Sequence, residues 1–317
     1  MQTYLDFEKP IAELDGKVAE LRGIAAEETS EAISSEIARL EDKTQQITKD
    51  IYAKLTPWQK TQVARHPARP HLMDYVATLI SDFTPLAGDR KFAEDRAVVA
   101  GLGLFRSEPV LIVGQEKGAD TESRIWHNFG MARPEGYRKA VRLMQLADRF
   151  GLPVISLVDT PGAYPGVGAE ERGQAEAIAR STDCCLALGV PNVAVILGEG
   201  GSGGAVAIAT ANAVLMLEHA IYTVASPEAS ASILWRDPNR AVNAATNMKI
   251  TAQDLLRLGI IDEIIPEPVG GAHRDPAKTI HRAGEAIAQT LSSLSELSRE
   301  EVRRARREKY LAIGREL

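Results

Sequence analysis

The sequence predicts an α/β fold, in which short apolar runs of strand character alternate with amphipathic runs of helical spacing. The chain has 317 residues, of which 44% are apolar and 25% charged, so it is long enough for one large core with smaller appendages. Two strand-to-helix turns, at residues 159–168 and 198–205, are rich in glycine. Because glycines let backbone N–H groups approach a ligand closely, we expect the functional site at these turns.

Helical spacing dominates the start of the chain. Apolar residues recur at steps of three and four over residues 33–55, and charged residues fill the other face, which predicts one long amphipathic helix. Ile11, Leu14, Val18 and Leu21 repeat this spacing on a shorter helix. We expect residues 1–58 to form a helical hairpin, which serves either as a structural arm or as a docking surface for another subunit.

A core region follows, and we place it at residues 59–272. The prolines at positions 57, 67, 70 and 85 interrupt the helical pattern, because proline removes a backbone donor. Strands are predicted at 98–104, 110–113, 154–158, 193–197, 213–217 and 222–224. Helices are predicted at 135–150, at 170–188 and directly after the second glycine turn.

Capping patterns mark two helices near the end of the chain. Thr251 and Asp254 form an N-capping pattern, Gly259 marks the end of that helix, and residues 260–265 predict a strand. Ser298 opens a last helix in the same way, within a C-terminal helical extension at residues 273–317. Five basic residues lie on it: Arg303, Arg304, Arg306, Arg307 and Lys309. We interpret them as a solvated face, and the alternative is a site for a phosphate-bearing ligand or an acidic partner.

Charge and cysteine content exclude several classes of protein. The net charge of −6 at pH 7 gives no general attraction to nucleic acid or to an anionic membrane, so we expect neither as a partner. The first residues do not resemble a secretory signal, and the apolar tract 203–217 predicts a buried helix and strand rather than a membrane span. Cys184 and Cys185 are too few for a zinc site and predict buried thiols. We therefore expect a cytoplasmic protein that holds no metal.

The second glycine turn matches the dinucleotide-binding fingerprint. Gly198-x-Gly200-x-x-Gly203 has the required spacing, and Glu218 lies at the end of the next apolar run, where a ribose-binding carboxylate would be. That fingerprint normally opens its domain, whereas several predicted strands and helices come first here. A nucleotide-binding oxidoreductase is therefore an alternative.

The same turn matches the nucleophile elbow of serine hydrolases. Gly200-x-Ser202-x-Gly204 would make Ser202 the nucleophile. Candidate histidines and acids lie downstream: His219, His273, His281, Asp237, Asp254 and Asp262. Nothing in the sequence pairs one of them with Ser202, so a serine hydrolase is the second alternative. A phosphate-binding P-loop is excluded, because no Gly-Lys-Ser/Thr follows the glycines.

A third interpretation treats the turn as an oxyanion hole. Two backbone N–H groups at the start of a helix stabilise a developing negative charge, and the helix dipole acts in the same direction. On this interpretation glycine is needed because a Cβ would hold the ligand away.

Longer motifs are more specific than these short patterns. Residues 158–174, 198–205 and 265–274 closely resemble the carboxyltransferase α subunit of bacterial multi-subunit acetyl-CoA carboxylase. Shorter agreements cover nearly the whole chain, at 5–8, 10–14, 64–67, 86–90, 128–131, 134–140, 226–228 and 231–235. The chain departs from the family's pattern at 115–116, 121–127 and 181–187.

The resemblance implies a fold and an enzyme. The fold would be a crotonase-like core of repeated ββα units with N-terminal and C-terminal helical extensions. The enzyme would be a biotin-dependent transferase that moves the carboxyl group of carboxybiotin, held on a biotin carboxyl carrier protein, to acetyl-CoA. The product would be malonyl-CoA, in the first committed step of fatty acid biosynthesis. The partners would be biotin carboxylase and a zinc-containing β subunit, paired with this chain as an α2β2 heterotetramer.

The resemblance also implies site residues. The N–H groups of Gly203 and Gly204 would form the oxyanion hole for the biotin ureido oxygen, and no side chain of this chain needs to act as the base. The residues expected to line the cavity are Gly162, Ala163, Tyr164, Gly201, Ser202 and Ala205. The loop at 160–168 either lines this cavity or is only a packed turn. Met248 and Lys249 resemble the core of a biotin acceptor, but the flanking acceptor residues are missing, and we interpret Lys249 as a surface lysine.

Overall fold

A computed structural model describes residues 3–27 and 31–315 of the chain. Its centre is one eight-stranded sheet in the order β1-β2-β3-β4-β5-β6-β8, and β7 pairs with β5 beside this path. The strands are β1 (Ile80–Pro85), β2 (Val98–Phe105), β3 (Glu108–Gln115), β4 (Val154–Thr160), β5 (Asn192–Gly201), β6 (Ala213–Leu217), β7 (Ile221–Thr223) and β8 (Glu263–Ile265). Buried apolar side chains of the sheet and its helices form one main cluster.

The pairing of the strands changes across the sheet. β1, β2 and β3 are antiparallel, and β2 and β3 are joined by Arg106 and Ser107, which both have the positive φ of a tight hairpin turn. From β3 through β4, β5 and β6 to β8 the pairing is parallel. The carboxyl ends of these strands therefore meet at one edge, which is where ligands bind in open parallel sheets.

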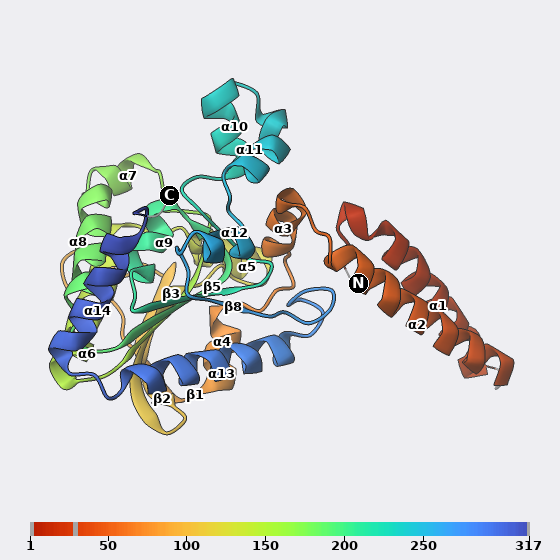
Figure 1. Cartoon of the computed structure of the whole chain (residues 1–317), viewed down its shortest axis with the longest axis horizontal. Helices are drawn as coiled ribbons and strands as arrows, with labels where there is room; N and C mark the ends of the chain where they lie inside the picture. The colour runs from red at the N-terminus through yellow and green to blue at the C-terminus, as the bar shows by residue number, and fades with distance from the viewer. Residues whose placement is uncertain (1–2, 28–30, 316–317) are drawn as a thin grey trace.

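Helices cover both faces of the sheet (Figure 1). The α-helices are α1 (Lys9–Glu27), α2 (Glu31–Tyr52), α3 (Pro57–Ala64), α4 (Leu72–Leu79), α5 (Thr121–Trp126), α6 (Pro134–Phe150), α7 (Val167–Glu170), α8 (Gln174–Ala187), α9 (Ser202–Ala209), α10 (Pro227–Trp235), α11 (Ala241–Asn247), α12 (Ala252–Arg257), α13 (Pro276–Leu294) and α14 (Arg299–Ala312). Short 3-10 helices are η1 (Asp6–Glu8), η2 (Asn128–Gly130) and η3 (Pro238–Arg240). On one face, α6 contacts β2 and β3 and α9 contacts β4 and β5; on the other, α4 and α13 contact the central strands.

The strands and helices expected in the core are present with shifted ends, and β5 differs most. The sequence predicts this strand at 193–197, whereas it runs from Asn192 to Gly201 and is buried throughout. The extra residues are mostly glycines, whose missing side chains let other segments approach. A Cβ on Gly198 would lie 2.8 Å from the carbonyl oxygen of Ala64, and one on Gly201 would lie 2.2 Å from that of Pro161. The glycines therefore extend the strand to the edge of the site.

One proline begins a helix in the segment where we expected prolines only to interrupt the helical pattern. Pro57 is the first residue of α3, a position where proline is tolerated because the N–H it lacks has no partner within the helix. The side chain of Thr56 caps this helix by accepting a hydrogen bond of 3.2 Å from the N–H of Gln59. The strand β1 and the helices α3, α4, α5, α10 and α11 are additions to the predicted elements.

The helical hairpin of α1 and α2 projects from the body of the molecule (Figure 1). Leu14, Val18 and Leu40 form a small core between the two helices, separate from the main one. At its base, Glu8 accepts hydrogen bonds from the Tyr52 hydroxyl at 3.0 Å and from the Arg274 guanidinium at 3.1 Å. The arm is thus tied to the body by polar contacts. The boundaries at residues 58 and 272 stay predictions.

The basic helix at the end of the chain, α14, corrects one interpretation. Arg306 is fully buried rather than solvated. Its guanidinium donates to the carbonyl oxygens of Leu188 at 2.7 Å and Val190 at 3.0 Å, and to the side chain of Asn192 at 3.0 Å. Burial lowers its pKa to about 10, so it is still charged at neutral pH. Arg306 is therefore a structural residue that fixes α14 to the sheet, because a buried guanidinium must satisfy its donors.

The cysteines and the apolar tract follow the sequence predictions. Cys184 and Cys185 are buried and form no disulfide, and burial raises their pKa values to about 11 and about 12, so both are neutral thiols. The tract 203–217 forms most of α9 and then β6. Among the helices within residues 3–27 and 31–315, none is long and apolar enough to cross a bilayer.

Candidate functional site

The second glycine turn joins β5 to α9. Ser202, the first residue of α9, has a φ of 50°, in the left-handed region that is unfavourable for a residue with a side chain. The first N–H groups of a helix have no acceptor within it, and within the described residues no side chain caps those of α9. The amides of Gly203 and Gly204 are therefore aligned donors at the positive end of a helix dipole.

The first glycine turn packs directly against the second. A Cβ on Gly204 would lie 2.8 Å from the backbone nitrogen of Ala163 and 2.8 Å from the carbonyl carbon of Gly162. The physical reason for glycine at 204 therefore differs from our expectation: its hydrogen faces the neighbouring loop and not the ligand. At Gly203 a Cβ would meet only the methyl groups of Ile178, at 3.3 and 3.4 Å.

An apolar cavity of about 630 Å³ adjoins the turn. Ser202 and Gly203 lie in its wall, opposite apolar side chains such as Val206, Ile250 and Leu255. Lys249, interpreted as a surface lysine, is exposed and lines the same cavity. This volume is in the range of small-molecule sites.

The structure brings together most of the expected lining residues. Gly201, Gly204 and Ala205 are buried beside the cavity wall, and Gly162 and Ala163 are partly exposed next to them. Tyr164 is folded back onto its own loop: Arg133 stacks on its ring at 4.9 Å, and its backbone N–H donates to Ala132 at 3.0 Å. Tyr164 thus fixes the shape of the first turn. The part that each of these residues plays in binding stays a prediction.

Gln115 ties the two turns together and was missed by the sequence reasoning. It is fully buried at the end of β3. Its Nε2 donates to the carbonyl oxygen of Gly204 at 2.9 Å, and its Oε1 accepts from the N–H of Asp159 at 3.3 Å. The sequence did contain a signal for it, because a polar glutamine follows a predicted buried strand at the edge of the sheet where we expected the ligand.

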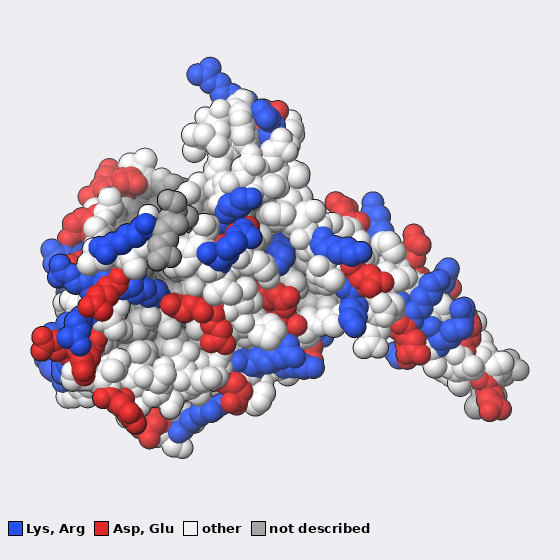
Figure 2. Space-filling view, in the orientation of Figure 1, with Lys and Arg blue, Asp and Glu red and all other residues white. Residues whose placement is uncertain are grey.

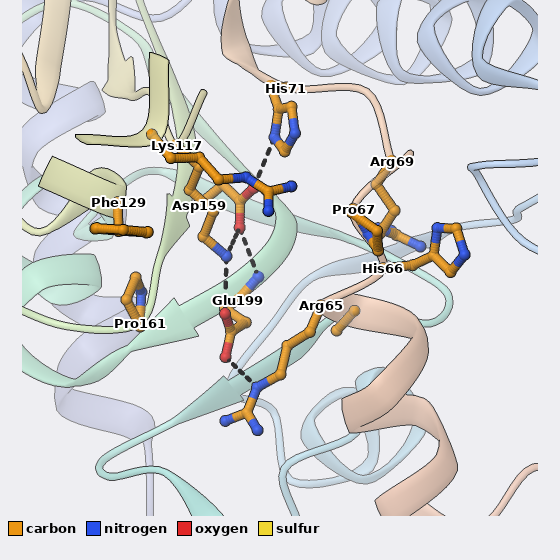
Figure 3. A pocket seen from close by; sticks show the side chains of 12 residues that line it. Arg65, His66, Pro67, Arg69, His71, Lys117, Phe129, Asp159, Pro161 and Glu199 are labelled. Atoms are coloured by element: carbon orange, nitrogen blue, oxygen red, sulfur yellow. Dashed lines mark hydrogen bonds and ion pairs between the residues drawn. The ribbon is translucent and has the colours of Figure 1, made fainter. Parts of the chain in front are cut away.

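A buried network of charges supports the turns from the other side (Figure 3). Lys117 lies between Asp159 and Glu199, at 2.8 Å from each carboxylate. Asp159 also accepts the backbone N–H of Glu199 at 2.9 Å, and Arg65 donates to Glu199 at 2.6 Å. Burial opposes the charge of Asp159, but the ammonium of Lys117 and the imidazole of His71 outweigh it and hold the pKa of Asp159 well below its ordinary value. These groups stay ionised and link the ends of β4 and β5, where the register of the two strands shifts.

The hydrolase alternative lacks its base. Of the described residues, those that line the apolar cavity beside Ser202 include no histidine and no carboxylate. His219 is buried and edge-on to the ring of Tyr52 at 5.5 Å, and burial lowers its pKa.

The dinucleotide alternative is also weakened, because the carboxylate of Glu218 accepts the N–H of Glu267 at 3.0 Å. In the described part of the chain no group of three or more potential metal ligands comes together.

Sequence comparisons place the chain among carboxyltransferases. The sequence model of the family described as acetyl co-enzyme A carboxylase carboxyltransferase-like matches residues 4–314. The chain is 68% identical over 317 residues to the acetyl-coenzyme A carboxylase carboxyl transferase subunit alpha of Beijerinckia indica, and covers all of both chains. It is also 68% identical to the protein of the same name from Nitrobacter winogradskyi, covering all of this chain and 98% of that one.

Solved structures share the fold at low sequence identity. Transcarboxylase 12S matches with a TM-score of 0.57 and 21% identity, over 71% of this chain and 42% of that chain. The β subunit of P. aeruginosa geranyl-CoA carboxylase matches with a TM-score of 0.57 and 14% identity, over 78% and 46%. The chain thus spans less than half the length of these two structures. A Pseudomonas malonate decarboxylase MdcD-MdcE hetero-dimer matches with a TM-score of 0.54 and 17% identity, over 68% and 87%.

The mixed sheet and the two facing glycine turns define a crotonase-like fold of the carboxyltransferase type. One β-β-α unit is visible in it, the antiparallel pair β2-β3 with α6, which contacts both strands. β6 and β7 each pair with β5 instead. The chain belongs to the acetyl-CoA carboxylase carboxyltransferase α-subunit family, and the family expected from its motifs is confirmed.

Proposed function

We propose that the chain, as an α subunit, transfers a carboxyl group from carboxybiotin to acetyl-CoA, with the reacting oxygen of biotin held at the turn before α9. The observation that carries this proposal is the pair of uncapped amides at Gly203 and Gly204 beside a cavity of about 630 Å³. These amides fit the neutral, planar ureido group, because they offer hydrogen-bond donors and no charge.

Carboxybiotin supplies the carboxyl group and, when that group leaves, a negative charge on its ureido oxygen. The two amides hold this charge without having a proton to lose, and the dipole of α9 acts in the same direction. One such donor typically contributes about 3 kcal/mol of transition-state stabilisation. The cavity wall around Val206 and Ile250 is apolar, and a partner that covers it would exclude water and strengthen both hydrogen bonds.

A partner subunit is needed to complete the site. Apart from the exposed Lys249, the described residues around the apolar cavity offer no charged side chain, and none offers a carboxylate or an imidazole, so the acyl substrate would be bound and activated by a partner. Large apolar side chains are exposed nearby: Val224 (80%), Ile233 (76%), Leu234 (64%) and Val242 (48%). In Figure 2 the projecting α10–α11 region carries little charge below its tip, unlike the mixed charges of the rest of that face. Such exposed apolar surface is typical of a subunit interface.

We infer that this interface binds a zinc-containing β subunit in an α2β2 assembly in the cytoplasm. Within that assembly, biotin would arrive on a carrier protein, after carboxylation by biotin carboxylase. The supports are the α-subunit family, the apolar surface beside the cavity and the lack of a metal cluster among the described residues.

The test is the reverse reaction of the assembled enzyme. The full chain, purified with its β subunit, should decarboxylate malonyl-CoA only when biotin is present. Ser202→Ala should retain most of this activity, because the proposal uses backbone amides and not the hydroxyl. Near-complete loss in a folded Ser202→Ala enzyme would instead favour the hydrolase alternative. No activity with the β subunit, together with saturable binding of NADH to this chain, would favour the oxidoreductase.

A further inference from the structure

A second hollow, which we call the strand-end cavity, lies at the carboxyl ends of β3, β4 and β5. It has a volume of about 290 Å³, and none of its described lining residues also lines the apolar cavity beside α9. Six of its lining residues carry the argument: Arg65, Arg69, His71, Lys117, Arg124 and Phe129. Parallel strand ends are the preferred place for ligands in such sheets, so this hollow is in a functional position.

Three of its cations are already neutralised. Arg69 is buried and forms a two-pronged ion pair with Glu267, at 2.8 and 2.9 Å. Arg65 is shared between Glu199 and Glu228, at 2.6 Å each. Lys117 lies between two carboxylates, as described above (Figure 3). These residues build a charged wall rather than a binding group, because each is already paired with carboxylates, although the buried Nε of Arg69 has no partner among the described residues.

Arg124 is not neutralised in this way. Its only hydrogen bond to a described residue runs from Nε to the carbonyl oxygen of Gly118, at 3.3 Å. Within residues 3–27 and 31–315 no carboxylate pairs with it. A guanidinium presents its N–H groups in a planar fork that matches a carboxylate, and the outer edge of this fork is unused.

His71 supplies a second group without a partner. Its side chain is only 10% exposed, and neither ring nitrogen makes a hydrogen bond to a described residue. Nδ1 lies 3.7 Å from Asp159, which is close enough for attraction but too long for a hydrogen bond. Burial opposes the charge of the imidazole, but Asp159 outweighs it and raises the pKa of His71. Both ring nitrogens are covered in this conformation, so a ligand in the cavity reaches the unpaired imidazole only when the ring turns toward it.

The wall of the cavity is also strained. Asn128 and Phe129 have φ values of 48° and 57°, two successive residues in the left-handed region. This conformation places the Phe129 ring, 47% exposed, on one side of the cavity beside Pro161, across from Pro67 and Arg69 (Figure 3). Strain of this kind persists only where the surroundings impose it, and it is concentrated at binding sites.

We propose that the strand-end cavity binds a small carboxylate, with its oxygens held by Arg124 and His71 and its carbon stem against Phe129. A volume of about 290 Å³ is several times that of a water molecule, so it accepts a carboxylate on a short acyl stem as well as bicarbonate. The ligand has two possible sources, the terminal carboxylate of a malonyl group and free bicarbonate. The first rests on the proposed function, and the second does not.

The test uses the full chain in complex with its β subunit, with malonate and bicarbonate as separate probes in a calorimetric titration. We expect saturable binding of at least one probe, weakened about tenfold or more by Arg124→Gln and by His71→Gln. Arg180→Gln is the matched control, because Arg180 is an exposed arginine on α8 paired with Glu176 at 2.7 Å. Far-ultraviolet circular dichroism of each variant confirms that the fold is intact.

The two sources give different results. Binding of malonate, with a raised KM for malonyl-CoA and an unchanged kcat in Arg124→Gln, supports the malonyl carboxylate. Binding of bicarbonate alone, with an unchanged KM, supports the free anion. No saturable binding of either probe, or equal binding by Arg124→Gln and Arg180→Gln, overturns the proposal. Because binding is measured without turnover, an inactive complex that still binds a probe refutes the carboxyl-transfer function and leaves this site in place.

Discussion

At the scale of single residues, the two glycines of the oxyanion turn have different roles. Gly203 faces the apolar cavity and has only the flexible side chain of Ile178 near its hydrogen. Gly204 is clamped against the backbone of residues 162 and 163, so it sets the distance between the two turns. Of the two positions, only Gly204 depends sterically on glycine.

This difference predicts opposite results for two alanine variants. Gly204→Ala should lower the rate of malonyl-CoA decarboxylation by about a hundredfold, because the new Cβ separates the turns and displaces an oxyanion donor. The overpacking should also destabilise the chain by about 1–3 kcal/mol. Gly203→Ala should retain most of the activity, because the methyl groups of Ile178 can move by a few tenths of an ångström. Steady-state kinetics and urea unfolding of both variants measure the two effects.

The outcome that contradicts this account is a folded Gly204→Ala enzyme with the activity of the parent. An equal loss of activity in both variants would also contradict it, since it would mean that the ligand, and not the first turn, requires glycine.

Two histidines beneath the arm make stability depend on pH. The rings of His66 and His273 stack at 3.8 Å. Burial lowers the pKa of His273 to about 3, and it also lowers the pKa of His66. The unfolded chain takes up a proton near pH 6.5, whereas the folded chain does not until far lower pH. The stability that comes from keeping these histidines neutral is therefore complete above pH 6.5 and is lost progressively as the pH falls below it.

We expect His273→Phe to reduce this acid sensitivity. The lowered pKa of His273 alone should reduce the free energy of unfolding by about 2 kcal/mol at pH 5, relative to neutral pH. Urea unfolding at pH 7.5 and pH 5 should therefore show a smaller difference in the free energy of unfolding for the variant. A difference equal to that of the parent chain would mean that His273 is protonated in the folded state. His281 is exposed, so His281→Phe serves as the control.

At the scale of elements, Arg306 is the buried charged residue among the contacts that fix α14 to the body of the molecule. The sequence could not distinguish the buried Arg306 from its four exposed or partly exposed basic neighbours, because all five are basic residues on one predicted helix. Only the tertiary structure reveals that the carbonyl oxygens at 188 and 190 converge on that position.

Arg306→Met should destabilise the chain by about 3–5 kcal/mol, because it leaves several buried carbonyl and amide oxygens without a donor. Arg307→Met is the matched control: Arg307 is exposed on the same helix and should change stability by less than about 0.5 kcal/mol. The free energies of unfolding in urea give the comparison. If the two variants were equally stable, the buried hydrogen bonds of Arg306 would contribute nothing.

The glycine-rich end of β5 shows the limit of element prediction. The apolar run at 193–197 identified the strand, because a buried parallel strand is continuously hydrophobic. Its last residues were assigned to a turn, since glycine is normally unfavourable in strands. They remain in the strand because Ala64 and Pro161 approach their missing side chains, and such contacts between distant segments cannot be derived from local sequence.

At the scale of the whole molecule, the alternation of strands and helices was enough to predict an α/β core, and long motifs identified the family. The turns at 159–168 and 198–205 are expected to lie at one site, since glycine and proline have strong local signals, and in the structure they pack against each other. The charged network of Lys117, Asp159 and Glu199 could not be predicted, because its members come from three strand ends that are neighbours only in the folded sheet. The network forms because these strands are neighbours in the sheet, and their positions along the sequence do not reveal that order.

The arm offers a test of how the whole molecule assembles. Its helices have their own small core and project away from the sheet, and the main cluster contains no side chain of the arm. We therefore expect a chain without residues 1–55 to keep a cooperative unfolding transition but to lose association with the β subunit, as measured by sedimentation velocity of the mixture. Glu8→Gln in the full chain is the companion variant, since it weakens the contacts to Tyr52 and Arg274 while leaving the arm present. If the shortened chain associates as tightly as the full one, the arm is only a structural appendage, and the exposed apolar side chains of α10 and α11 must carry the interface alone.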